Sequence, residues 1–484
     1  MRTMLRVLRF RYATAALVLV AVAALYGAAA LSRPSAGGAD AGGVRAPITS
    51  AVAVCPGHEG GRLSVQSAKG GPSGGRIDTS PTRGGAPLAS LTAAGQSWTK
   101  DTGDGEDSYT VRASGGIAAG LEAEQTTHWG GGPDRGLAGT RCATPGTDLW
   151  FLGPGPADAD ALDLYLTNVD SQPASVDLRA LSEAGPLDTT DGRATSIAPY
   201  TTAVVPIGGS PEGLGDIVKT AHDLALHVHT TGGRVAASLR ARIGEKKGIE
   251  WVPPSPAPSA AQVVPGVPGG SGERRLVVAV PGDADARVRV RVVTPDGEFT
   301  PRGQDVVEAP AGTVTPVDLG LSGRPAAVRV VADRPVIAGF AATRGGDVGY
   351  GAATAPLGTP DGPDRLTTGV VADNRFDSVL TLTAPSGASS VQVTTVGGQG
   401  PGPSREIGVP AGRTVETTLA PPPGGDGGFG ALITIKPGSA PVYAARMMST
   451  GKGEEFLFTV LPVVPASTTR WLPRAADTQG ALIP

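Results

Sequence analysis

Short runs of alternating apolar and polar residues recur along most of the chain and are separated by turns rich in glycine and proline. In 286–292, for example, Arg287, Arg289 and Arg291 alternate with valines. Successive side chains of a strand point to opposite faces, so the valines can enter a core while the arginines meet water. Many short strands of this kind, joined by regular turns, predict an all-β protein.

A pair of strands separated by a polar turn occurs four times, beginning at residues 108, 224, 327 and 432. An opening strand with its partner, a Thr-rich middle strand and a closing strand accompany the pairs, which indicates about seven strands per hundred residues. This count predicts tandem β-sandwich repeats that resemble the immunoglobulin architecture. The repeat is too long for a single propeller blade, which needs only about 40–50 residues.

The predicted organisation follows from these repeats and from shifts in composition. Its segments are a basic cytoplasmic N-terminus (1–11), a transmembrane helix (12–31), a flexible tether (32–46), sandwich repeats at 47–146, 147–252, 272–358 and 364–466, a Pro-rich linker (253–271) between the second and third repeats, and a C-terminal tail (467–484). Because Pro-rich segments act as semi-rigid spacers, we expect two halves, each a pair of sandwiches.

The N-terminus predicts export. Four arginines, the last of them Arg11, precede an uncharged apolar run that is long enough to span a bilayer, which needs about 20 residues of helix. Because positive charges stay in the cytoplasm, we expect a single-pass plasma-membrane protein whose C-terminal bulk is extracellular. The alternative is a secreted protein, since 28–30 and 39–41 both fit an A-x-A cleavage site.

Charge and cysteine content agree with this placement. The formal net charge of −3 implies neither nucleic acid nor an anionic surface as a partner of the body. The chain has two cysteines, Cys55 and Cys142, and a lone pair in an exported chain predicts one disulfide. Two free thiols are the alternative.

Two groups of residues could bind a metal ion. His227 and His229 are two apart on a predicted strand, so both rings project from one face and could hold an ion together with a third ligand; a solvated face is the alternative. Asp101 and Asp104 belong to a run of four carboxylates in seven residues, which could be a calcium-stabilised loop or simply an acidic turn. No cofactor is predicted.

Trp98 and Trp129 occur in polar surroundings of a chain that has few aromatic residues. An exposed Trp on a β-module can stack on a sugar or anchor a protein partner. The alternative is packing in a core or between domains, which we expect for Trp150. Because the sequence shows no catalytic constellation, the predicted function is non-enzymatic: an envelope scaffold or interaction protein. The alternative is a cell-wall glycan-binding protein. A hydrolase with a site between modules is the third hypothesis.

The whole pattern resembles an uncharacterised actinobacterial family of exported proteins that is known only by a domain-of-unknown-function label. The resemblance depends on the basic N-terminus with one membrane segment, the early CPG at 55–57, the segment RCATPGTDLWFLG at 141–153 and the later VPAGRT at 409–414. It covers nearly the full chain. It implies an actinobacterial source and an envelope-glycan context, and no functional residue is transferred from it.

Overall fold

A computed structural model describes residues 16–27, 44–57, 61–68, 74–102, 108–187, 189–244, 248–321, 323–358, 367–373, 375–397, 400–422, 428–466 and 468–472. Residues 16–27 are helical and exposed. Within the described part of the chain, no helix has both the length and the apolar character needed to cross a bilayer. The predicted membrane segment extends beyond the described residues at both ends, so the anchor stays a prediction.

The described residues form two units. In the smaller unit, β1 (Val44–Pro47) pairs antiparallel with β36 (Thr469–Leu472). The predicted tether and tail are therefore wrong in part, because the end of one and the beginning of the other are strands of a small sheet. The larger unit, residues 48–468, is called the body here.

The first half of the body contains two repeats. Repeat 1 consists of β2 (Ser50–Cys55), β3 (Arg62–Ser67), β4 (Gly75–Pro81), β5 (Ala89–Leu91), β6 (Ser97–Asp101), β7 (Tyr109–Gly115), β8 (Leu121–Trp129) and β9 (Gly136–Arg141). Repeat 2 consists of β10 (Asp148–Pro154), β11 (Ala161–Thr167), β12 (Ala174–Ser182), β13 (Gly185–Leu187), β14 (Thr195–Ile197), β15 (Thr202–Pro206), the 3₁₀ helix η1 (Gly215–Val218), β16 (Asp223–Gly232), β17 (Ala236–Arg242), β18 (Ile249–Val252) and β19 (Pro254–Ser255).

The second half contains two more. Repeat 3 consists of β20 (Ser259–Val267), β21 (Arg274–Ala279), β22 (Ala286–Thr294), β23 (Gly297–Phe299), β24 (Val307–Ala309), β25 (Val314–Asp318), β26 (Ala326–Arg344) and β27 (Asp347–Ala352). Repeat 4 consists of β28 (Thr367–Asp373), β29 (Asp377–Ala384), β30 (Ser389–Gly397), β31 (Gly400–Val409), β32 (Arg413–Leu419), β33 (Gly428–Ile435), β34 (Tyr443–Thr450), the 3₁₀ helix η3 (Gly453–Glu455) and β35 (Leu457–Val463).

All four repeats share one strand topology in the described residues. The first sheet of repeat 4 has the order β28-β33-β30-β31 and the second sheet the order β32-β29-β34-β35, and repeat 1 has the same two orders in β2-β7-β4-β5 and β6-β3-β8-β9. Repeat 2 repeats the plan with β13 and β14 sharing the outer position, and repeat 3 does so with β26 running through both sheets. In repeats 2, 3 and 4, as in repeat 1, the residues between the two sheets form a hydrophobic core.

The strand order corrects the predicted immunoglobulin-like topology. In an immunoglobulin sandwich the first strand pairs with the second. Here the first strand of each repeat pairs with the sixth strand in repeats 1 and 4 and with the seventh in repeats 2 and 3, and the second strand belongs to the opposite sheet. Alternating polarity reports which face of a strand is buried, but it does not report which strand is its neighbour.

The predicted Pro-rich linker is also wrong. Its residues form β19, which pairs with β10, and β20, which pairs with β26 as the opening strand of repeat 3. Proline is tolerated here because β19 is short and lies at a sheet edge, where a missing N–H costs little. The body therefore has no spacer between its halves.

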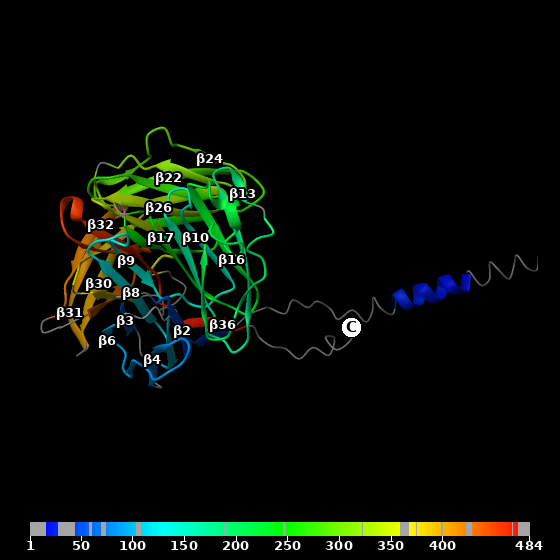
Figure 1. Cartoon of the computed structure of the whole chain (residues 1–484), viewed down its shortest axis with the longest axis horizontal. Coiled ribbons are helices and arrows are strands. Elements are labelled where there is room, and N and C mark those ends of the chain that lie inside the picture. Colours follow the sequence, from blue (N-terminus) through cyan, green and yellow to red (C-terminus); the bar gives the residue numbers. More distant parts are fainter. Residues whose placement is uncertain are drawn as a thin grey trace, which may run out of the picture. The chain divides into compact units, whose positions relative to one another are not determined.

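The repeats instead close into a ring within the body. The first sheet of each repeat packs against the second sheet of the next, and the first sheet of repeat 4 packs against the second sheet of repeat 1. Figure 1 shows repeat 1 in blue and repeat 4 in orange, next to each other at this closure. Sheets around one centre resemble a β-propeller, and each repeat is long because it supplies two such sheets.

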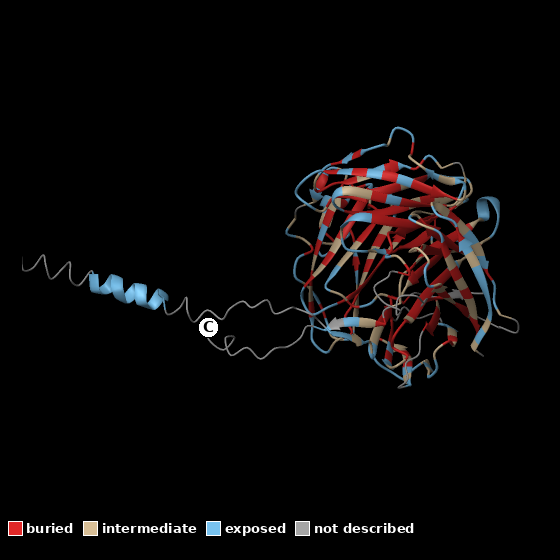
Figure 2. Cartoon of the chain, turned by 180° about the vertical axis from the view of Figure 1, so that it is seen from behind, coloured by how far each residue is buried: buried red, intermediate tan, exposed pale blue. Residues whose placement is uncertain are grey.

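The closing strands β9, β18, β27 and β35 meet at the centre, each touching the next. Glycines permit this approach: a Cβ on Gly139 would lie 3.1 Å from the Thr459 side chain, and one on Gly349 would lie 2.5 Å from the Phe458 ring. Figure 2 shows buried residues running through the interior strands of the body. The innermost strands are thus packed across four repeats, not within one.

Two carboxyl groups are buried among these strands. Glu250 Oε1 accepts a hydrogen bond from the Gly139 N–H (3.2 Å), and Asp347 Oδ2 accepts one from the Phe458 N–H (2.8 Å). Each carboxyl therefore satisfies an edge N–H of a neighbouring repeat. Burial raises the pKa of both groups well above the ordinary range.

Candidate ligand-binding pocket at the centre of the body

A pocket of about 260 Å³ lies where the four closing strands end. Every repeat contributes to its wall, and we call it the axial pocket. Its lining residues are Gly139, Thr140 and Arg141 of repeat 1, Pro253, Pro254, Ser255 and Pro256 of repeat 2, Ala353, Thr354 and Ala355 of repeat 3, and Val460, Leu461, Pro462 and Val464 of repeat 4.

Each closing strand is followed within a few residues by a proline: Pro145, Pro256, Pro356 and Pro465. Proline lacks an N–H and cannot continue a central strand, so it marks the end of each closing strand. Of these four, Pro256 lines the axial pocket. The sequence analysis found the closing strands but not the pocket, because nothing in a single repeat shows that four such ends meet.

Two hydroxyl groups of the wall have no hydrogen-bond partner among the described residues. Ser255 Oγ and Thr354 Oγ1 are buried, and neither makes a hydrogen bond with another described residue. Buried hydroxyls normally have a partner, and an exception points to water or a ligand. The axial pocket therefore has an apolar wall with two buried hydroxyls among its lining residues.

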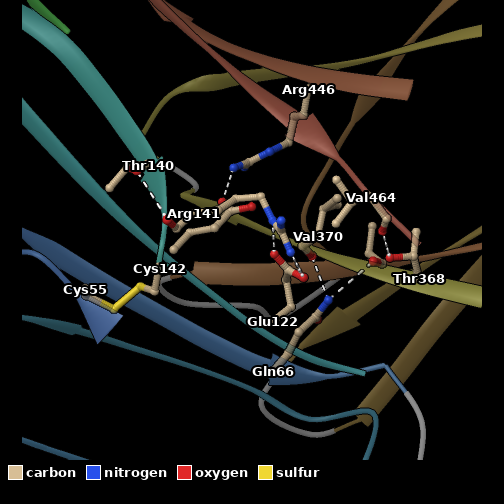
Figure 3. Close-up of polar contacts among 12 residues, drawn as sticks. Cys55, Gln66, Glu122, Thr140, Arg141, Cys142, Thr368, Val370, Arg446 and Val464 are labelled. Atoms are coloured by element: carbon tan, nitrogen blue, oxygen red, sulfur yellow. Dashed lines mark hydrogen bonds and ion pairs between the residues drawn. A yellow bond between two sulfur atoms is a disulfide. The ribbon is translucent and has the colours of Figure 1, made fainter. Parts of the chain in front are cut away.

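Repeats 1 and 4 are joined by a buried ion pair and a side-chain hydrogen bond. The fully buried Arg446 of β34 donates to Glu124 of β8, next to the pair within repeat 1 in which Arg141 Nη2 donates to Glu122 Oε2 (2.7 Å). Gln66 Nε2 donates to the Val370 carbonyl oxygen (2.8 Å). Figure 3 shows these contacts beside the disulfide. The ring closure thus uses directional polar contacts between segments about 300 residues apart, and these fix the register of the two repeats.

The predicted disulfide is confirmed. Cys55 and Cys142 are bonded, and their Cα atoms lie 4.3 Å apart. The bond joins the end of β2 to the residue after β9, where the Val54 and Ala143 backbones also pair. It therefore ties the opening strand of repeat 1 to its closing strand next to the axial pocket.

The structure brings the two predicted metal-binding histidines together with a third candidate ligand. His227 and His229 lie on β16, and Asp148 of β10 is opposite His229 in the register. Their ligand atoms all lie within 4.8 Å of one another. Burial lowers the pKa of His227, against the opposing effect of the Asp148 carboxylate.

The other predicted site residues do not form one site. Trp98 is half-buried on β6 and packs against the core of repeat 1. Val65 of β3 pairs with Trp98 on one side and with Ala123 of β8 on the other. Trp129 is six residues beyond Ala123 on β8, so the two tryptophans are about 20 Å apart along the strand direction. Asp101 makes a two-pronged ion pair with Arg62 (2.7 and 3.1 Å), which lowers its pKa, and Asp104 lies outside the described residues.

A second, more polar pocket of about 290 Å³ lies between repeats 2 and 3, lined in part by Asp158, Glu273 and Arg275. Behind it, Asp223 is buried and accepts a hydrogen bond from Arg275 Nη1 (2.7 Å). Burial raises the pKa of Asp223 to about 6, although Arg275 opposes the rise. This carboxyl had no distinguishing signal in the sequence.

Fold and pocket together define a class: an all-β protein of four repeats closed around an axial pocket. The sequence model of a family of unknown function, DUF5719, matches residues 98–422, and the chain belongs to this family. The predicted family resemblance is thereby confirmed, and its actinobacterial source stays a prediction. No curated protein matches the chain. Among solved structures, a tetra-tandem repeat in the extending region of a large adhesion protein matches 85% of this chain and 98% of its own at 14% identity; its TM-score of 0.09 supports no conclusion.

Proposed function

We propose that the protein is a non-enzymatic, extracytoplasmic interaction protein, anchored in the plasma membrane, which binds a segment of another envelope protein in its axial pocket. The observation behind the proposal is the composition of that pocket. Four repeats supply an apolar wall rich in proline, with two buried hydroxyls that have no partner among the described residues. Concave, mostly apolar pockets with a few polar groups are the usual form of a binding site.

A protein segment suits this wall better than a glycan does. The described lining residues of the axial pocket include no aromatic side chain on which a sugar could stack. Of the two residues that motivated the glycan alternative, Trp98 packs against the core of repeat 1 and Trp129 is half-buried on β8, and neither lines the axial pocket. Apolar rings and backbone carbonyls can instead receive an apolar side chain and the N–H groups of a peptide.

Blocking the axial pocket tests the proposal. Ala355 is exposed at the pocket, so Ala355→Trp would fill it without entering a core, and Ala86→Trp places the same side chain on an exposed turn of repeat 1 as the control. Solubilised envelope proteins would be cross-linked to each variant and quantified. We expect Ala355→Trp to lose partners that the wild type and Ala86→Trp retain. Equal capture of partners by all three proteins would refute the pocket as the binding site. If the wild type and Ala355→Trp were retained equally on purified cell wall, the glycan alternative would be favoured.

Fractionation tests the anchor separately. The four arginines before the apolar run predict full-length protein in the membrane fraction, degraded by protease added outside the cell. Protein recovered from the medium with a new N-terminus near residue 31 or 42 would show cleavage and secretion.

A further inference from the structure

Three side chains with metal-binding groups converge on one face of the first sheet of repeat 2. Asp148 lies opposite His229 on the neighbouring strand, and His227 is two residues away on the same strand. Residues at positions i and i+2 project from the same face. His227 Nε2 lies 3.2 Å from Asp148 Oδ1, and His229 Nδ1 lies 3.8 Å from Asp148 Oδ2.

We propose that Asp148, His227 and His229 bind one divalent transition-metal ion, with zinc as the best match. Imidazole nitrogen and carboxylate oxygen are zinc ligands at about 2.0–2.2 Å, so ligand atoms within 4.8 Å of one another can share an ion after small side-chain rotations. Calcium and magnesium fit less well, because they prefer a full set of oxygen ligands. Both cysteines are in the disulfide and do not compete.

The site is open to solvent on one side. The side chains of Asp148 and His229 are 56% and 43% exposed, whereas that of His227 is 15% exposed. An ion could therefore enter from solvent and keep water as its fourth ligand. Three protein ligands plus water is the arrangement of zinc sites that have an open position.

One ligand is already held in place. The ring of Trp150 stacks on that of His227, with centroids 4.0 Å apart and planes 5° from parallel. Trp150 itself packs at the edge of the cluster that joins repeats 2 and 3. A ligand whose orientation is fixed before binding loses little freedom when the ion arrives.

The charges that face the site permit a cation. On the neighbouring strand β12, Asp177 lies opposite His229 and Arg179 lies opposite His227. Asp177 Oδ1 accepts a hydrogen bond from the Ala194 N–H (2.8 Å), which leaves its charge near the site without making it a ligand. The two carboxylates outweigh the single guanidinium, so the net local charge without an ion is negative when both imidazoles are neutral.

Zinc titration of the untagged full chain, stripped with chelator, tests the proposal. Competition with a chromophoric chelator should show one zinc per chain, and His229→Gln and Asp148→Asn should each lower the affinity about tenfold or more. The control is His222→Gln, because His222 is an exposed histidine of the same repeat that pairs with Asp158. Its affinity should equal that of the wild type.

The alternative is an Asp148–histidine ion pair that binds no metal. Absence of zinc binding by the wild type, or affinity unchanged in both His229→Gln and Asp148→Asn, would overturn the proposal. Metal-free thermal melts would show that the variants are folded. Cobalt in place of zinc adds a second readout, since the visible spectrum of a tetrahedral site should disappear in His229→Gln and persist in His222→Gln.

Discussion

Asp223 offers a direct test of how the repeats are coupled. It opens β16 of repeat 2 and is almost fully buried, and its partner Arg275 comes from β21 of repeat 3. Replacing it by Asn keeps the shape and the hydrogen-bonding oxygen while removing the ionisable group. The contact between repeats 2 and 3 should therefore persist in Asp223→Asn.

The expected magnitude follows from the pKa. Burial raises the pKa of Asp223 from 3.8 to about 6, and a tenfold change in a protonation equilibrium corresponds to about 1.4 kcal/mol, so the shift is worth about 3 kcal/mol. Because the native pKa is raised, the contribution of this group is fully present below about pH 4 and is lost as the pH rises to about 6. Asp223→Asn should match the wild type near pH 4 and exceed its stability by up to about 3 kcal/mol above pH 7.

Urea denaturation of both proteins between pH 4 and 8 measures this difference. The comparison cancels the other buried carboxyls, Glu250 and Asp347, whose raised pKa values act in the same direction. Asp216→Asn is the control, because Asp216 is exposed on η1, and surface substitutions usually change stability by less than about 0.5 kcal/mol. A difference between Asp223→Asn and the wild type that does not change with pH would refute the reasoning.

Three further predictions concern the ring. Cys142→Ala should lower the free energy of unfolding of the body by roughly 4–5 kcal/mol, the loop-entropy value for a bond that spans 87 residues. In calorimetry the unfolding transition of the whole body should move to lower temperature, without a separate early transition of repeat 1. Glu124→Gln should cost about 3–5 kcal/mol in urea denaturation because it leaves Arg446 buried without its carboxylate, and the double variant Glu124→Leu/Arg446→Met should recover most of this loss. A fragment of residues 259–463 should aggregate or unfold non-cooperatively by circular dichroism, because both of its end sheets lack partners; a soluble fragment with a sharp transition would show that the halves are independent after all.

Several features were predictable because they depend on local chemistry. The alternation in 286–292 predicts β22, whose valines are buried and whose arginines are exposed. The four similar segments predict four repeats, and two cysteines in an exported chain predict the disulfide. His227 and His229 could be placed on one face from their spacing alone. Each of these inferences needs only the period of a strand or the count of a residue type.

The sequence by itself determined the all-β class, the number of repeats, the disulfide and the pairing of two histidines on one strand. Only the tertiary structure decided the partners of each strand, the closure of repeat 4 on repeat 1 through Arg446 and Glu124, the axial pocket, and Asp148 as a neighbour of the histidines. The physical reason is that a strand period specifies which face is buried but is the same for every possible neighbour. The choice among neighbours depends on side-chain fit and buried polar contacts between residues as far apart as Gln66 and Val370.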